Sequence, residues 1–162
     1  MESAACHLNN GWRPLPTELL RRPRTLLRCG PEPKVAAIVN WYGITDVADL
    51  LDGPNMKSYA VTWLGSQTDR VLIAKRVSPM TYVRSGLPAI LTIHGDADPT
   101  VPYQHGVQLT NALKAAGVKT ELVTVPGGKH GGFTLAENLK NFQSIKSFLG
   151  GLGLTSPPLK TN

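Results

Sequence analysis

From residue 34 onward, short apolar runs alternate with helical patterns. Three of these runs are rich in β-branched residues and bounded by Gly or Pro, namely residues 35–42, 89–93 and 120–125. Short runs of this composition are typical of buried strands. The pattern therefore predicts three strands in the second part of the chain.

Helical patterns follow the second and the third run. Residues 103–116 place apolar side chains near one side of a helix, and Gly117 stands where a left-handed cap would end it. Thr134 and Glu137 have the spacing of a capping box. An apolar stripe follows, formed by Leu135, Leu139, Phe142, Ile145 and Leu149. Alternating strands and helices imply right-handed crossovers, so we expect an α/β fold with a parallel sheet of about three strands flanked by helices.

The segment between residues 46 and 83 is longer than a single crossover helix requires. Residues 45–51, 58–65 and 69–77 predict short helices, and Ser78-Pro79 ends the last of them. We interpret the segment as an inserted helical region that helps to shape a pocket.

Composition and charge exclude several classes of protein. The chain has 162 residues and a net charge of +6, but the excess is local, because five arginines lie before residue 30. They are Arg13, Arg21, Arg22, Arg24 and Arg28. We therefore expect no nucleic-acid partner. No apolar run reaches the roughly 20 residues that span a bilayer, and no secretory signal is evident, so we expect a cytoplasmic protein without a membrane partner.

Candidate chemistry lies where the second and third runs end. The second continues into His-Gly-Asp-Ala-Asp, residues 94–98, and the third into a glycine-rich loop around His130. Side chains at the carboxyl ends of adjacent parallel strands meet at one edge of the sheet. A carboxylate that holds one imidazole nitrogen leaves the other free as a base, which is two thirds of a nucleophilic triad.

Each of these residues also has a structural interpretation. Asp96 is expected to hold a turn, and Asp98 is open between a turn and a catalytic role. His130 has two glycines on either side, which let the backbone turn sharply, although a loop histidine is usually only solvated. His94 is expected to be packed and hydrogen-bonded at the end of its strand, and His105 to lie on a helix surface.

The segments LPAILTIHGDADPTVPYQHG and VPGGKHGGF resemble the acid and histidine segments of the α/β-hydrolase superfamily. The resemblance is strongest to acetyl/feruloyl-esterase-like carboxylesterases and their prolyl-oligopeptidase-type relatives, and it covers residues 33–149. It implies that Asp98 is the triad acid and His130 the base, in the chain order Ser, Asp, His. It implies no metal or organic cofactor.

The nucleophile segment departs from the family pattern Gly-x-Ser-x-Gly. The chain opens MESAACHL, in which Ser3, Ala4, His7 and Leu8 align with the family string, while Met1, Ala5 and Cys6 stand at glycine positions. The resemblance makes Ser3 the candidate nucleophile and the backbone N–H of Ala4 the candidate oxyanion-hole donor. A Cβ at Ala5 would crowd the tight turn.

This alignment sets the expected organisation of the chain. Residues 1–33 would be a degenerate nucleophile-elbow remnant with a basic irregular segment, residues 34–150 the C-terminal region of an α/β-hydrolase, and residues 151–162 a tail. The strands that usually precede the elbow would be missing, so the first strand would present an unpaired edge that invites self-association. A shifted reading frame across residues 9–30 would explain the basic segment, a hypothesis that nucleotide resequencing tests.

We therefore expect a serine hydrolase that cleaves small-molecule carboxylic esters by a Ser-His-Asp acyl-enzyme mechanism. As a truncated form, it would have weak or no activity alone. Two alternatives stay open: a fragment of a prolyl-oligopeptidase-like serine peptidase, and a non-catalytic α/β-hydrolase-like module. The sequence does not specify the acyl group or the alcohol.

Overall fold

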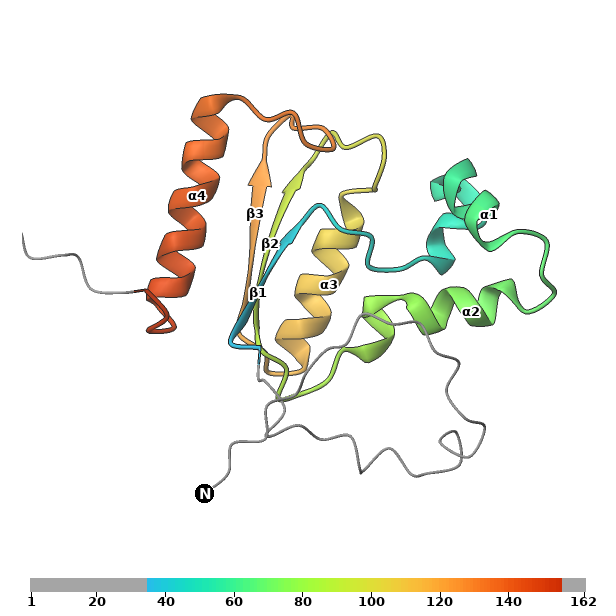
Figure 1. The fold of residues 1–162 in the computed structure, drawn as a ribbon, viewed down its shortest axis with the longest axis horizontal. Coiled ribbons are helices and arrows are strands. Elements are labelled where there is room, and N and C mark those ends of the chain that lie inside the picture. Colours follow the sequence, from blue (N-terminus) through green and yellow to red (C-terminus); the bar gives the residue numbers. More distant parts are fainter. Residues whose placement is uncertain (1–34, 156–162) are drawn as a thin grey trace, which may run out of the picture. The chain divides into compact units, whose positions relative to one another are not determined.

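The computed structural model describes residues 35–155, and these form a three-stranded parallel sheet with helices on both faces. The strands are β1 (Ala37–Trp41), β2 (Ala89–Gly95) and β3 (Thr120–Val125), in the order β1-β2-β3. Their carboxyl ends point to the same edge of the sheet (Figure 1). The predicted strands and their parallel arrangement are confirmed; β1 is shorter than expected, and β2 continues two residues further, through Gly95.

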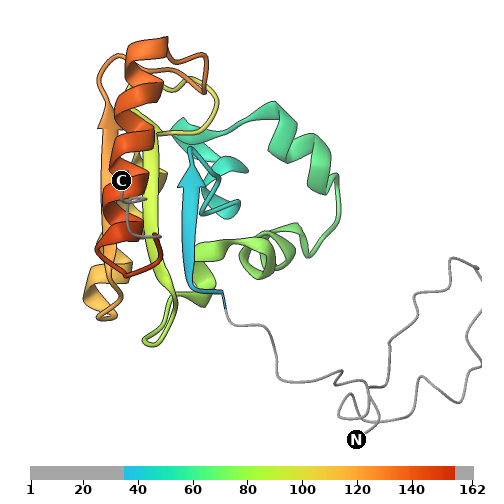
Figure 2. The same ribbon diagram turned by 60° about the vertical axis from the view of Figure 1, so that its left-hand side comes forward.

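Helices α3 (Gln104–Ala115) and α4 (Leu135–Gly150) cover opposite faces of this sheet (Figures 1 and 2). Side chains of β2 alternate between these faces. Ile90 packs in the cluster that contains Leu109 and Leu113 of α3, whereas Leu91 and Ile93 pack with Phe148 of α4. Both predicted helices are therefore present, and each covers one side of the central strand.

The ends of the helices follow the expected local rules. The Thr134 hydroxyl accepts a hydrogen bond from the Glu137 N–H, and the Glu137 carboxylate accepts one from the Thr134 N–H, which completes the capping box. Gly117, two residues beyond the end of α3, has a φ of +71°. Glycine adopts this left-handed conformation without steric cost.

The apolar stripe of α4 is partly buried only in its second half. Leu135, Leu139 and Phe142 are more than half exposed, whereas Ile145 and Leu149 are partly buried and pack in the cluster of buried Phe148. The helix packs on β2 and β3. Phe142 contacts Trp41 at the end of the edge strand β1, with ring centroids 6.1 Å apart.

The segment between β1 and β2 contains α1 (Ser58–Leu64) and α2 (Arg70–Val77). Three single turns of 3₁₀-helix accompany them, at Ala48–Leu50, Gly53–Asn55 and Pro79–Tyr82. Its own apolar cluster consists of Val47, Leu50, Leu51, Ala60, Leu64 and Ala74. This insertion therefore has a core of its own, in which the burial of one leucine contributes about 1.5–3 kcal/mol to stability.

Buried Ser78 ties the beginning of this insertion to its end. The Ser78 hydroxyl accepts a hydrogen bond from the Val47 N–H at 2.8 Å and donates one to the Ala74 carbonyl at 2.7 Å. The predicted end of the last helix at Ser78 is confirmed, because α2 ends at Val77. Within residues 35–155, no helix is both long enough and apolar enough to cross a membrane.

Candidate active site

The candidate site lies where the strands end, and its acid is Asp98 in the turn after β2. One carboxylate oxygen, Oδ1, accepts hydrogen bonds from the N–H groups of Thr100 at 2.8 Å and Val101 at 3.0 Å. The Asp98 side chain has no exposed surface. Two backbone donors therefore hold this carboxylate in place, independently of its contacts with other side chains.

His130 comes from the loop after β3 and meets the second carboxylate oxygen. Its Nδ1 atom lies 2.8 Å from Asp98 Oδ2, as predicted from the ends of adjacent strands. Because the carboxylate can only accept, Nδ1 carries the hydrogen and Nε2 is left with a free lone pair. The imidazole side chain is 34% exposed.

Glycines without side chains let the two turns approach each other. A Cβ atom on Gly95 would lie 2.1 Å from the Gly128 carbonyl oxygen, so only glycine fits at this position. The Gly128 carbonyl accepts a hydrogen bond from the Ala97 N–H at 3.1 Å. Asp96 also contacts the histidine loop, because its Oδ1 accepts a hydrogen bond from the Gly127 N–H at 2.6 Å. Backbone contacts thus join the acid turn to the histidine loop.

The surroundings of Asp98 keep its carboxyl group ionised. Burial alone would raise the pKa of this carboxyl, but hydrogen bonds from Val101, His130 and Thr100 outweigh that effect and hold the pKa below its ordinary value. The group is therefore an anion across the neutral pH range. A carboxylate at this position orients the imidazole ring and favours its protonated form.

Tyr42, at the end of β1, packs against the exposed side of the pair. Its ring centroid lies 4.5 Å from that of His130. Tyr42 has a φ of +39°, which is uncommon for a residue with a side chain. Such strain persists only where the surrounding structure over-determines it, and here it places the ring beside the histidine.

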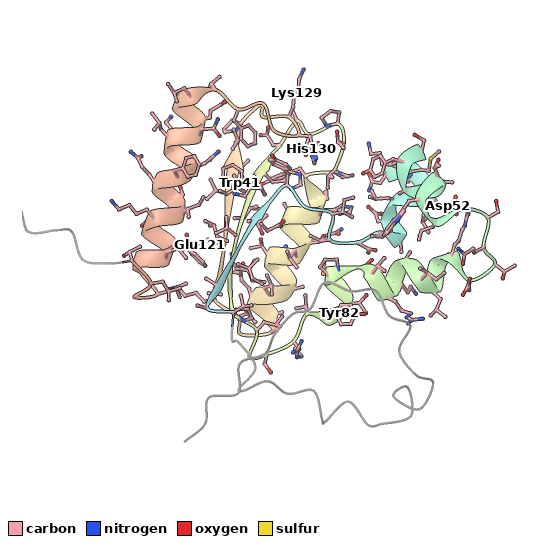
Figure 3. All side chains as sticks on the ribbon, viewed as in Figure 1. Trp41, Asp52, Tyr82, Glu121, Lys129 and His130 are labelled. Carbon is pink, nitrogen blue, oxygen red and sulfur yellow. The ribbon has the colours of Figure 1, made fainter. Side chains whose placement is uncertain are left out.

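A pocket of about 360 Å³ opens beside His130. Its lining consists of Trp41, Tyr42, Gly43, Ile44, Tyr59, Thr100, Val101 and His130. Figure 3 shows Trp41 and His130 at the same end of the sheet, whereas Tyr82 and Glu121 lie elsewhere. The pocket is mostly apolar with a base at its edge, which suits an uncharged organic substrate.

The insertion forms one wall of this pocket, as expected. The Tyr59 hydroxyl donates a hydrogen bond to the Thr100 carbonyl at 2.9 Å, and Lys57 Nζ donates one to the Pro99 carbonyl at 2.8 Å. Both contacts tie α1 to the acid turn. Burial, assisted by the Asp98 charge, raises the pKa of Tyr59, so its hydroxyl stays a donor. The sequence contains no signal for Tyr59, because its role depends on how the insertion docks.

The other two histidines of the described region have different fates. His94 is buried at the end of β2 and hydrogen-bonded to the Val101 carbonyl at 3.1 Å, which confirms the prediction. The prediction of a surface position for His105 is wrong, because this residue is fully buried. Its Nδ1 accepts a hydrogen bond from the Thr45 N–H at 3.1 Å, which draws the ring beneath the insertion.

The candidate nucleophile Ser3 and the candidate oxyanion donor Ala4 lie outside the described residues, as do His7 and the arginine-rich segment. Within residues 35–155, no group of three or more His, Cys, Asp or Glu side chains could hold a metal ion. The described part of the site is therefore a carboxylate, an imidazole hydrogen-bonded to it and a pocket.

A parallel sheet with helices on both faces, and with a carboxylate and a histidine after adjacent strands, matches part of the α/β-hydrolase fold, and solved esterases superpose on it. The model of the BD-FAE family matches residues 26–113, which is more than half of the chain. The chain belongs to the BD-FAE family of esterases within this fold.

Individual relatives agree with this assignment. The chain is 28% identical over 145 residues to esterase LipQ of Mycobacterium tuberculosis, a match that covers 76% of this chain and 34% of LipQ. A truncated form of a carbohydrate esterase from gut microbiota superposes with a TM-score of 0.60 at 32% identity, covering 75% of this chain and 44% of that structure.

The apo form of Thermogutta terrifontis esterase 2 gives a TM-score of 0.60 at 28% identity and covers 79% of this chain and 48% of that one. This chain thus spans between a third and a half of the length of these proteins.

Proposed function

We propose that this chain carries the acid and base of a serine carboxylesterase that acts on small-molecule esters. The observation that supports the proposal most strongly is the Asp98–His130 pair, with its 2.8 Å contact beside an apolar pocket. The esterase relatives and the BD-FAE family match support the same reaction class.

In the proposed mechanism, His130 Nε2 removes the proton from a serine hydroxyl as the serine oxygen attacks the ester carbonyl. The protonated ring then gives this proton to the leaving alkoxide, so that an alcohol departs and an acyl-enzyme remains. A water molecule next attacks the acyl carbonyl, its proton passes to His130, and the ring returns it to the serine oxygen. The products are the free acid and the original enzyme.

We assign the nucleophile to Ser3 and one oxyanion-hole donor to the Ala4 N–H. The chain order Ser, Asp, His and the similarity of MESAACHL to the family string support this assignment. The elbow lacks the family's glycines, and a Cβ at Ala5 would crowd the tight turn that the nucleophile needs. We therefore propose weak or no turnover by this chain alone.

A fluorophosphonate probe tests the proposal, because it reacts once with an activated serine and needs no turnover. We expect slow labelling that maps to Ser3 and falls at least about tenfold in Ser3→Ala, His130→Ala and Asp98→Asn, since positioned bases typically contribute about 10²–10⁴. Ser144→Ala is the matched control, because among residues 35–155 its hydroxyl bonds only the Lys140 carbonyl on α4.

Labelling that is absent from Ser3, or that persists in His130→Ala, would contradict the proposed site. Stoichiometric labelling together with rapid hydrolysis of a short acyl ester would show that the chain is more competent than we propose. A short acyl ester and a proline-containing amide, assayed side by side, separate an esterase from a peptidase.

A further inference from the structure

His94 is a buried imidazole that the proposed mechanism does not use. It lies on the face of β2 that α3 covers, and its side chain has no exposed surface. Gly106 of α3 packs directly on the ring, because a Cβ atom there would lie 3.1 Å from His94 Nδ1. The imidazole is therefore held in place by the strand and by the helix above it.

The neighbours of His94 determine which nitrogen carries its hydrogen. Nε2 is hydrogen-bonded to the Val101 carbonyl at 3.1 Å and lies 3.2 Å from Asp98 Oδ2. Both oxygens are acceptors, so Nε2 must carry the hydrogen. Within the described residues, Nδ1 has no hydrogen-bond partner. Burial lowers the pKa of His94, and a neutral ring with its hydrogen on Nε2 satisfies these contacts.

Through these contacts, His94 affects both oxygens of the Asp98 carboxylate: Oδ2 directly, and Oδ1 through Val101. The Nε2 atom of His94 lies 3.2 Å from Oδ2, the same oxygen that His130 Nδ1 contacts. It also binds the carbonyl of Val101, the residue whose own N–H donates to Oδ1. The ring thus fixes one of the two backbone donors and places a positive dipole end next to the carboxylate.

We propose that His94 is a positioning residue for Asp98, which holds the acid turn through Val101 and stabilises the carboxylate in the orientation that faces His130. The inference rests on the proposed function for the roles of Asp98 and His130. The contacts that carry it do not depend on turnover.

The experiment follows the Asp98 carboxyl carbon by NMR during an acid titration of the full chain. His94→Leu removes the N–H group and keeps a large apolar side chain. We expect the pKa of Asp98 to rise by about 0.5–1 unit, because His94 is one of several donors that together lower this pKa. His94→Gln restores an N–H donor, and we expect it to recover at least half of that rise.

Thr92→Val is the matched control, because Thr92 is buried two residues earlier on the same face and contacts Asn40 rather than Asp98. The nearby Tyr59, Lys57 and His130 are unchanged in every variant. We expect an unaltered Asp98 titration in the control. An Asp98 pKa in folded His94→Leu that equals the wild-type value, or an equal rise in Thr92→Val, would overturn the proposal.

A measurement on the wild-type chain keeps the inference testable if His94→Leu does not fold. The ¹⁵N shifts of His94 should show a hydrogen on Nε2, none on Nδ1 and no protonation while the fold persists. A hydrogen on Nδ1 would refute the proposal. Because none of these readouts needs catalysis, a failure of serine labelling would leave them interpretable.

Discussion

His105 shows how much a single buried side chain contributes to the arrangement of the site. Its Nδ1 accepts from the N–H groups of Thr45 and Asp46, and its Nε2 lies 3.3 Å from Asp49 Oδ2. The ring therefore joins α3 to the start of the insertion, 60 residues earlier in the chain.

His105→Leu should lower the free energy of unfolding by about 2–4 kcal/mol, because two backbone donors would lose their acceptor in a buried place. Urea denaturation of the full chain measures the change. Gln104→Leu makes the same kind of substitution at the exposed neighbouring position and should have little effect. An equal loss in both variants would mean that the hydrogen bonds of His105 are unimportant.

At the residue scale, the sequence predicted the meeting of Asp98 and His130 because both follow apolar runs that end at one sheet edge. It did not predict the burial of His105, since helical periodicity does not reveal a polar partner in a distant segment. Tyr42 and Tyr59 were missed for a related reason: each acts through a ring that is placed by tertiary packing.

At the scale of elements, the sequence predicted where α4 begins but not that the side chains of its first turns are exposed. Periodicity and capping rules located the helix, because both depend on neighbours within four residues. They could not show that its first turns would be exposed, since this depends on which strands lie beneath. Of the single 3₁₀ turns of the insertion, Ala48–Leu50 falls within a predicted helix, whereas Gly53–Asn55 and Pro79–Tyr82 were missed.

Thr134→Ala should destabilise the chain by about 0.5–2 kcal/mol, through loss of the N-cap of α4. The carboxylate of Glu137 adds a pH dependence, because its hydrogen bonds with Thr134 lower its pKa from the ordinary 4.5. Its contribution is present above pH 4.5 and is lost as the pH falls through the lowered value.

Urea denaturation at neutral pH and below about pH 4 measures both effects. Glu137→Gln is the control, because glutamine keeps a capping box but does not titrate. A pH dependence of the wild-type chain that Glu137→Gln leaves unchanged would assign it to other carboxyl groups.

At the scale of the whole molecule, β1 is an edge strand of the described sheet, with Ile38 partly exposed on it. An exposed edge with apolar side chains is a template for pairing with another chain. Self-association through this edge stays a prediction.

Size-exclusion chromatography at several concentrations tests it, and we expect Ile38→Lys to shift the chain toward the monomer, because an edge lysine opposes pairing. Val71→Lys alters a comparably exposed apolar residue on α2 and should leave the association unchanged. Association that responds only to Val71→Lys would place the contact on the insertion instead.

The contact between Gly95 and Gly128 has a consequence for how this site could evolve. The distance between acid and base is set by backbone atoms of two turns, whereas Trp41, Ile44 and other lining residues of the pocket come from other segments. A mutational library should therefore find Gly95 nearly invariant while Ile44, a pocket residue outside both turns, varies under selection for new substrates. Because different residues set the acid–base distance and part of the pocket lining, substrate specificity can change while the geometry of the acid and the base stays the same.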